Sequence, residues 1–376
     1  MAATNWYVDP LDGDNANDGT SDAQAWATIQ YAIDNLTQTT NQGDIINIKD
    51  SATITLSADL NYSSLTQSNT HPVMLRGYTS TAGDGGYALI DENGTYRFGG
   101  TSTRHNMIFQ NLDVTNGGFN TKLQLGNWCT VKECRFSNMP STIYSFITIT
   151  GGTGALIENC EFSNINRYAI AVHSTGSLLV IRGNHFFDTG AYTMIGAIDL
   201  GSATGAVISH NIFNHTGTAI GINGSGTTNH AQRIFNNTFF TDGTGDAIDI
   251  ARNTFCFVEN NIFEGWAKAI DFANASVMPG ISVSNNHFYD CTTDIDTTTY
   301  TTFMIDAGNF KSAGSSVLSK SGANTHANRL AYFEPTGDAI GGGIDGNSIG
   351  AVQLTSAGGG STKIIRNPNM GGGIIQ

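Results

Sequence analysis

Apolar residues recur along the chain in a short segment with the pattern apolar-x-x-Asn-x-Phe. Copies span Ile181–Phe186, Ile208–Phe213, Ile234–Phe239, Val258–Phe263 and Val283–Phe288. Two earlier copies, Val131–Phe136 and Ile157–Phe162, carry cysteine at the asparagine position, and a degenerate copy spans Phe109–Val114. Successive copies begin about 25 residues apart, which is the spacing of a solenoid repeat.

A second apolar segment repeats with the same period and alternates between inward and outward residues, as a strand does. Its copies are Phe146-Ile147, Ala169-Ile170, Ala197-Ile198, Ala219-Ile220, Ala247-Ile248, Ala269-Ile270 and Asp294-Ile295. Each repeat therefore holds at least two strands. Helical repeats and propeller blades need longer units, and leucine-rich repeats need regular leucines. The pattern favours a parallel β-helix.

Stacking of equivalent residues explains which residue types recur, because successive coils lie about 4.8 Å apart. We predict that residues 108 to 295 form parallel coils with one internal phenylalanine column: Phe136, Phe162, Phe186, Phe213, Phe239, Phe263 and Phe288. A second column, Asn184, Asn211, Asn237, Asn261 and Asn286, is expected to form a ladder at a tight, left-handed corner. Cys134 and Cys160 extend this column, and we expect reduced, buried thiols there.

The sequence divides into four parts. Residues 1–50 predict an N-terminal cap with the strand Trp6-Tyr7-Val8, an Asp/Gly loop, a helix with apolar spacing from Trp26 to Leu36, and a first strand at residues 43–48. Residues 51–300 form the coils and residues 301–353 a C-terminal closing segment. Residues 354–376 read as a Gly-rich linker followed by an extended tail.

Composition and charge exclude several classes of function. The net charge of -14 disfavours binding to nucleic acid. Apolar runs are too short to span a membrane, and the first residues lack the features of a secretion signal. The five cysteines are odd in number and have no CxxC spacing, so a disulfide framework or zinc site is not expected.

The N-terminal segment resembles that of bacterial and phage right-handed β-helix proteins of the pectate-lyase-like superfamily. The matching residues are Trp6-Tyr7-Val8, Asp14, Gly19-Thr20-Ser21, Trp26-Ala27-Thr28-Ile29, Ala32-Ile33 and Gly43-Asp44, with a similar closing segment at Ile344–Ala351. The expected fold is therefore all-β: a right-handed, single-stranded parallel β-helix with an N-terminal cap helix. Because this fold hosts lyases, hydrolases, adhesins and tailspikes, the resemblance implies no particular reaction.

An acidic row is the first candidate site. The outward position of the second strand, taken coil by coil, is Thr148, Ala171, Asp199, Gly221, Asp249, Asp271 and Asp296. Asp249 and Asp271, one coil apart, would approach the about 5 to 5.5 Å separation of retaining glycosidases. Asp199 and Asp249, two coils apart, would approach the about 6.5 to 9.5 Å inverting separation. The row could also bind Ca²⁺, although solvent-facing surface aspartates are the favoured interpretation.

Two further groups of residues are weaker candidates. Lys132, Glu158 and Arg182 lie beside Arg135, Glu161 and His185, where Arg182 or His185 could serve an eliminating lyase. Their alternating signs favour lateral ion pairing instead. The loop containing Asp9, Asp12, Asp14 and Asp18 is rich in possible Ca²⁺ ligands but fails the EF-hand pattern, so a turn-rich loop is favoured. No cofactor is otherwise expected.

These observations favour a noncatalytic, virion-associated phage appendage: a capsid decoration, fibre or tail component that is made in the host cytoplasm and used in assembly or in attachment to surface glycans. The alternative is a polysaccharide depolymerase, a hydrolase or lyase acting extracellularly or on a particle through Asp199, Asp249 and Asp271. The tail residues Ile364, Ile365, Ile374 and Ile375 are expected to bury against a neighbouring subunit or another virion protein. A homotrimer is the favoured assembly, by resemblance to tailspikes.

Overall fold

The structure is a computed structural model that describes most of the chain. The described residues are 3–37, 43–65, 71–99, 103–118, 123–140, 143, 145–173, 177–190, 192–201, 203–223, 231–241, 244–251, 255–272, 280–297, 304–311, 316, 318–321, 329–336, 349–351, 353–354 and 363–364. They fall into two compact units: Met1–Val180 with Phe187–Thr204, and Ile181–Phe186 with Gly205–Gln376. Each unit is built from parallel strands.

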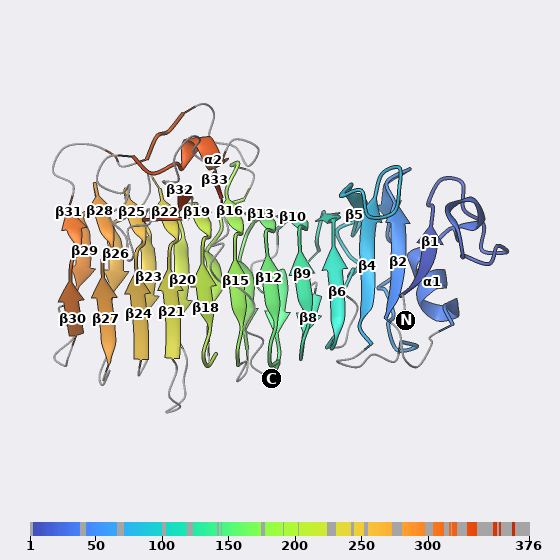
Figure 1. Ribbon diagram of the computed structural model, residues 1–376, viewed down its shortest axis with the longest axis horizontal. Helices are drawn as coiled ribbons and strands as arrows, with labels where there is room; N and C mark the ends of the chain where they lie inside the picture. The colour runs from blue at the N-terminus through green and yellow to red at the C-terminus, as the bar shows by residue number, and fades with distance from the viewer. Residues whose placement is uncertain are drawn as a thin grey trace. The chain divides into compact units, whose positions relative to one another are not determined.

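In the first unit the strands form three parallel sheets, each in chain order (Figure 1). One sheet holds β1 (Thr4–Val8), β2 (Asp44–Lys49), β4 (Val73–Tyr78), β6 (Met107–Gln110), β9 (Thr130–Lys132) and β12 (Leu156–Glu158). The next holds β3 (Ile54–Thr55), β5 (Ala88–Asp91), β7 (Leu112–Thr115), β10 (Arg135–Met139) and β13 (Glu161–Ile165). The last holds β8 (Leu123–Leu125), β11 (Ile147–Ile149), β14 (Tyr168–Val172) and β17 (Gly196–Asp199).

The second unit repeats this plan with three parallel sheets. One sheet holds β18 (Val207–Ser209), β21 (Ala231–Phe235), β24 (Phe255–Glu259), β27 (Ile281–Ser284) and β30 (Met304–Ala307). The next holds β19 (Ile212–Asn214), β22 (Thr238–Phe240), β25 (Ile262–Glu264), β28 (His287–Tyr289) and β31 (Phe310–Lys311). The last holds β20 (Thr218–Ile222), β23 (Asp246–Ile250), β26 (Lys268–Asp271) and β29 (Thr293–Asp296). The strands β15 (Val180–Arg182) and β16 (His185–Phe187) lie where the units divide. Each complete coil thus contributes three strands, and the predicted parallel solenoid is confirmed.

The predicted phenylalanine column fills the interior of both units. In the first unit the rings of Phe136 and Phe162 stack with centroids 5.2 Å apart. In the second unit, successive centroids from Phe186 through Phe213, Phe239 and Phe263 to Phe288 lie 5.0, 4.7, 4.7 and 5.2 Å apart. All these side chains are buried. The one-coil repeat of the sequence therefore becomes a continuous apolar stack within each unit.

The asparagine column of the second unit is a hydrogen-bonded ladder. Both the backbone N–H and the Nδ2 group of Asn211 donate to Oδ1 of Asn237 at 3.0 Å, and Nδ2 also donates to the Ile181 carbonyl. The same pattern runs from Asn184 to Asn309, one coil further than predicted. The left-handed backbone lies one residue earlier than expected, at Gly183, His210, Asn236, Asn260 and Asn285. The ladder residues are selected for their hydrogen bonds, and the preceding residues form the turn.

Cysteines replace this ladder in the first unit. Cys134 donates its thiol to the Lys132 carbonyl, and Cys160 contacts the Glu158 and Val131 carbonyls. All five cysteines are free thiols, and four of them are buried. Burial raises the pKa of the Cys256 thiol to about 12. The expectation of buried, reduced thiols is confirmed for Cys134 and Cys160.

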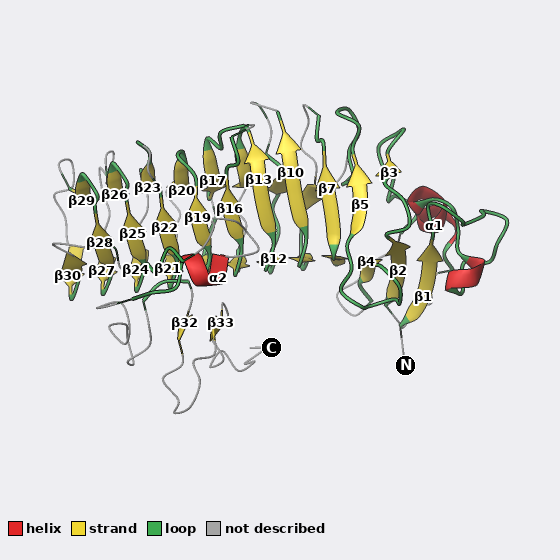
Figure 2. Ribbon diagram, turned by 90° about the horizontal axis from the view of Figure 1, so that it is seen from above, coloured by secondary structure: helices red, strands yellow, loops and turns green. Residues whose placement is uncertain are grey.

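The N-terminal segment forms the predicted strand and a short helix, which lie beside each other in Figure 2. A 3-10 turn, η1 (Asp22–Gln24), precedes α1 (Ile29–Asn35), whose first turn is capped by the Thr28 hydroxyl accepting from the Tyr31 N–H. The Trp6 and Trp26 rings stack at 5.3 Å. That α1 caps the end of the solenoid stays a prediction.

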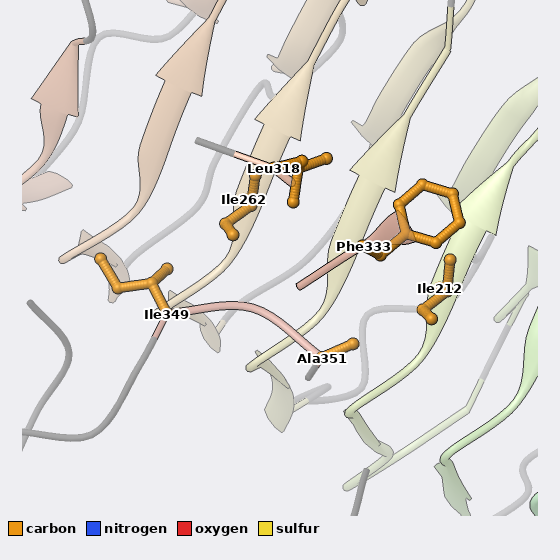
Figure 3. Close-up of a cluster of buried hydrophobic side chains, with 6 residues drawn as sticks. All are labelled: Ile212, Ile262, Leu318, Phe333, Ile349 and Ala351. Carbon is orange, nitrogen blue, oxygen red and sulfur yellow. The ribbon is translucent and has the colours of Figure 1, made fainter. Parts of the chain in front are cut away.

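A C-terminal segment packs on the outside of β19, β22 and β25. Leu318, Phe333, Ile349 and Ala351 cover Ile212 and Ile262 in one buried cluster (Figure 3). Phe333 follows the short helix α2 (Arg329–Tyr332). Glu264, which is buried, pairs with Lys320 and accepts a 2.6 Å hydrogen bond from Ser316. The predicted closing residues Ile349 and Ala351 therefore cover an apolar flank of the coils, while residues 344–348 lie outside the described residues.

The described chain contains no helix that is both long and apolar enough to cross a membrane.

Replacement of Phe239 by alanine should lower the free energy of unfolding by ~3 to 5 kcal/mol, because it opens a cavity between two rings that each stack at 4.7 Å. Denaturant unfolding followed by circular dichroism measures this loss. Phe257→Ala is the matched control on an outward, exposed position of β24, and its loss should stay within about 1 kcal/mol. Equal losses for the two variants would contradict the burial of the phenylalanine column.

Candidate functional site

The outward positions of the predicted row are in register within each unit, but its neighbouring aspartates all belong to the second unit. Gly221, Asp249, Asp271 and Asp296 are register partners on β20, β23, β26 and β29 of the second unit. Thr148, Ala171 and Asp199 are register partners on β11, β14 and β17 of the first unit. The predicted register is confirmed within each unit, and Asp249 and Asp271 stand on neighbouring strands. That these aspartates form a functional site stays a prediction. Asp199 belongs to the other unit.

A lysine that the sequence reasoning missed neutralises much of this row. Lys268 Nζ lies 2.8 Å from Asp271 Oδ2 and 2.9 Å from Asp296 Oδ2. The hydrogen bonds that Lys268 donates to these two carboxylates raise its pKa above the usual value. The signal was present in the sequence, because Lys268-Ala-Ile-Asp271 repeats the frame of Asp246-Ala-Ile-Asp249 one coil earlier. The lysine therefore lies opposite Asp246 in register.

Asp271 does not face solvent, and the expectation that it does is wrong. Only 4% of the residue is exposed, and Oδ2 is held by Lys268. Oδ1 is buried and has no hydrogen-bond partner among the described residues. Burying a carboxylate is costly unless a counter-charge accompanies it, and the ion pair with Lys268 provides that charge.

Asp249 is half-buried, and its pKa lies well above that of an ordinary aspartate. Burial is the main cause that raises its pKa to about 6, and the negative charges of Asp271 and Asp246 add to it. Burial likewise raises the pKa of Asp246. A protonated carboxyl group beside an ionised one is the arrangement from which glycosidases draw a general acid and a base or nucleophile.

Asp199 is engaged in a turn of the first unit. Its Oδ1 accepts a 3.0 Å hydrogen bond from the Gly201 N–H, and the residue is half-buried. Burial raises its pKa, while that hydrogen bond and the charges of His173 and Arg167 oppose the shift. Its role within its own unit is thus that of a turn-forming carboxylate.

The basic residues considered for a lyase are arranged laterally. Arg135 lies 3.7 Å from Glu161 and 3.8 Å from Asp113, and its guanidinium stacks over the Tyr87 ring. Lys132 and Glu158 are register partners on β9 and β12. The predicted lateral pairing is confirmed for Arg135 with Glu161. In the second unit, His185 is buried against Phe333.

The aspartates of the N-terminal loop act mainly as hydrogen-bond acceptors for the loop itself. Asp9 accepts from the Leu11 and Asp12 N–H groups and from Ser51, and pairs with Lys49 at 3.0 Å. Burial raises the pKa of Asp9, but these bonds outweigh it and lower the pKa to about 2. Asp14 and Asp18 each accept from a backbone N–H two residues later. Within the described residues, no three acidic, histidine or cysteine side chains converge as metal ligands would.

The described part of the C-terminal tail pairs with its own chain. Strand β33 (Lys363–Ile364) is antiparallel to β32 (Gln353–Leu354). Residues Ile365, Ile374 and Ile375 lie outside the described residues, as does the side chain of Ile364. Their burial against a partner stays a prediction.

Comparison with known proteins identifies the fold. Residues 90–233 match the family described as right handed beta helix region. The structure is similar to pectate lyase Pel9A, with a TM-score of 0.65, 13% identity, and 92% of each chain covered. It is also similar to the PL6 family polysaccharide lyase Pedsa3628 from Pseudopedobacter saltans, with a TM-score of 0.49, 14% identity, and 70% of this chain and 61% of that chain covered. No curated protein sequence matches the chain.

A phage protein is a further structural neighbour. Geobacillus virus E2 ORF18 gives a TM-score of 0.46 at 11% identity, covering 94% of this chain and 65% of that chain. At such identities the likeness establishes the fold alone. The chain is a right-handed parallel β-helix protein, and the resemblance carried by its N-terminal residues is confirmed at that level.

Asp249→Asn should make the protein more stable than the wild type at pH 7. The folded state raises the pKa of Asp249 to about 6, so the wild type loses stability as pH rises from about 4 through 6, and asparagine does not. Thermal unfolding measured between pH 4 and pH 7 should show a difference that shrinks towards pH 4. An Asp249→Asn protein that is less stable than the wild type at pH 7 would contradict the raised pKa of Asp249.

Proposed function

We propose that this protein is a noncatalytic β-helical appendage of a virion that binds surface glycans. The observation that carries the proposal is the burial of Asp271 beneath its ion pair with Lys268. Glycoside hydrolysis needs two carboxyl groups that both reach the scissile bond. A carboxylate with 4% exposure and one oxygen bound to lysine is poorly placed for that task.

The other charged residues support the same proposal. An eliminating lyase needs a base that reaches the substrate and a cation that binds the acidic sugar. Arg135 is already shared between Glu161 and Asp113, and His185 is buried. Of the two groups that the sequence offered for elimination, Arg182 and His185, burial therefore closes His185 to a substrate.

Free thiols support assembly in a reducing compartment. Cys129, Cys134, Cys160 and Cys256 are buried as thiols, and Cys291 is also unpaired. Disulfides are common in exported proteins and rare in the cytosol. Synthesis in a host cytoplasm followed by incorporation into a particle fits this pattern, as does the N-terminal resemblance to phage β-helix proteins.

A polysaccharide hydrolase is the second candidate, and one observation favours it. Asp249 is accessible enough to contact a ligand and has a pKa of about 6, which suits a general acid. In that case Asp249 would protonate the leaving oxygen. Asp271 would act as nucleophile or base once its ion pair with Lys268 had opened and its carboxylate had become exposed. The two candidates differ in whether the bound glycan is shortened.

Incubation of the full-length protein with a panel of acidic and neutral polysaccharides tests the proposal. We expect at least one polysaccharide to be retained on immobilised protein, with no new reducing or unsaturated ends in solution. Asp249→Asn and Asp271→Asn should leave retention unchanged. New reducing ends that disappear in Asp249→Asn would instead establish the hydrolase. Retention of no polysaccharide would contradict glycan binding.

The tail is the proposed anchor to the particle, or to other subunits of a homotrimer. Truncation after Ser356 should leave the far-ultraviolet circular dichroism spectrum unchanged and abolish incorporation into particles, because the truncated chain lacks Ile364, Ile365, Ile374 and Ile375. A variant of full length with serine at these four positions controls for chain length and should fail equally. Normal incorporation of either protein would refute the anchoring role.

A further inference from the structure

Two large apolar residues of the first unit occupy a backbone conformation that large residues usually avoid. Trp128 has a φ of 56° and Leu178 a φ of 55°. Most other non-glycine left-handed positions in this unit are asparagines: Asn93, Asn106, Asn111, Asn116, Asn138, Asn159 and Asn164. The left-handed conformation costs a larger residue roughly 1 kcal/mol or more. Since asparagine would form the same corner more easily, the turn does not explain the choice of tryptophan and leucine.

Neither residue is used to fill the core. Trp128 is 48% exposed and Leu178 is 61% exposed. The Trp128 N–H donates to the Thr153 carbonyl, and the Gly154 N–H donates to the Ser177 carbonyl, so corners at 128, 154 and 178 follow one another on successive coils. The fold thus presents two exposed apolar side chains on a line, with a glycine between them.

Gly154 allows the indole ring to rest on the coil. A Cβ atom at Gly154 would lie 2.3 Å from Cε3 of Trp128, so any side chain there would displace the ring. The backbone therefore supports one part of the indole, while nearly half of the side chain remains open to solvent. A supported and partly exposed aromatic ring is pre-organised for contact with a flat ligand.

The residues that follow these corners on β12 and β15 are apolar. Leu156 and Val180, which open β12 and β15 two residues after the corners, are half-buried. The Thr153 and Ser177 hydroxyls lie 3.0 Å apart, and Asn127 Oδ1 accepts from the Thr153 N–H at 2.9 Å. An apolar strip edged by hydroxyl and amide groups matches a ligand that has one apolar face and a rim of hydroxyls.

We infer that the strip formed by Trp128, Leu156, Leu178 and Val180 is a binding subsite for a neutral pyranose residue of a glycan. The C–H face of the sugar would pack on the indole, and its hydroxyl edge would meet Thr153, Ser177 and Asn127. The strip itself carries no formal charge, and the next outward residues on β9 and β12, Lys132 and Glu158, are register partners of opposite charge. A neutral sugar is therefore the expected ligand, rather than a uronic or sialic acid. This inference rests on the proposed glycan binding and assigns it a place and a ligand class.

Tryptophan fluorescence of the full-length protein can report on this subsite. The chain has four tryptophans, and Trp6, Trp26 and Trp266 are buried, so a ligand on the strip should alter chiefly the emission of Trp128. Neutral hexasaccharides of glucose, galactose and mannose are the probes, and a hexauronate is the charge control. We expect one or more neutral probes to shift the emission and the hexauronate to leave it unchanged.

Variants separate recognition from a structural role. Trp128→Asn should weaken binding of the responding hexasaccharide at least tenfold, measured by calorimetry, and should leave the melting temperature unchanged or raise it, because asparagine suits the left-handed corner. Leu11→Ala, at a residue that is 64% exposed elsewhere in the first unit, should alter neither. A Trp128→Asn protein that melts lower and binds as tightly as the wild type would show that Trp128 is structural.

The outcomes also separate this inference from the proposed function. Glycan binding that survives Trp128→Asn overturns the subsite and leaves glycan binding in place. Wild-type protein that binds none of the neutral probes, while retaining an acidic polysaccharide, likewise overturns only the subsite. Protein that binds no glycan at all, and whose self-association is lost in Trp128→Asn, would mean that the strip is a contact between protein chains and would overturn both.

Discussion

Register stacking between coils is the constraint on which the rest of this structure depends. Parallel coils about 4.8 Å apart place each residue directly against its equivalents in the next coils. A column can therefore repeat a residue type only if identical side chains can contact one another favourably. Phenylalanine does so by ring stacking, as at Phe213 and Phe239. Asparagine does so because each amide oxygen accepts from the asparagine before it, while each amide nitrogen donates onward, which satisfies a buried polar column without water.

Register stacking also makes a column of like charges on an outer face unfavourable. A column of aspartates would repel itself, and the structure inserts Lys268 between Asp271 and Asp296, as it places Arg135 between Asp113 and Glu161. The acidic row is therefore explained first by stacking and neutralisation. Burial and the neighbouring charges of Asp271 and Asp246 raise the pKa of Asp249. The exposed Trp128 stands apart from these columns, because stacking does not require it.

The repeat spacing was sufficient to predict the columns, since each column repeats one residue type every coil. It did not locate the left-handed turn, because the turn residue before each ladder asparagine varies among glycine, histidine and asparagine. The repeat spacing also did not predict the burial of Asp271, because that burial depends on the side chain of Lys268 and not on the length of the repeat. Apolar residues at the outward positions Ile212, Phe240 and Ile262 were a readable signal that another segment covers this flank. The strain at Trp128 is a backbone property that sequence alone does not display.

Chemical labelling of carboxyl groups tests most directly whether Asp271 is closed to a substrate. The native protein is treated with a water-soluble carbodiimide and an amine, and the modified aspartates are identified by peptide mass spectrometry. The exposed Asp12 and the half-buried Asp249 should be modified, and Asp271 should react only after denaturation. Modification of Asp271 in the native protein at a rate close to that of Asp12 would contradict the noncatalytic role proposed for the acidic row.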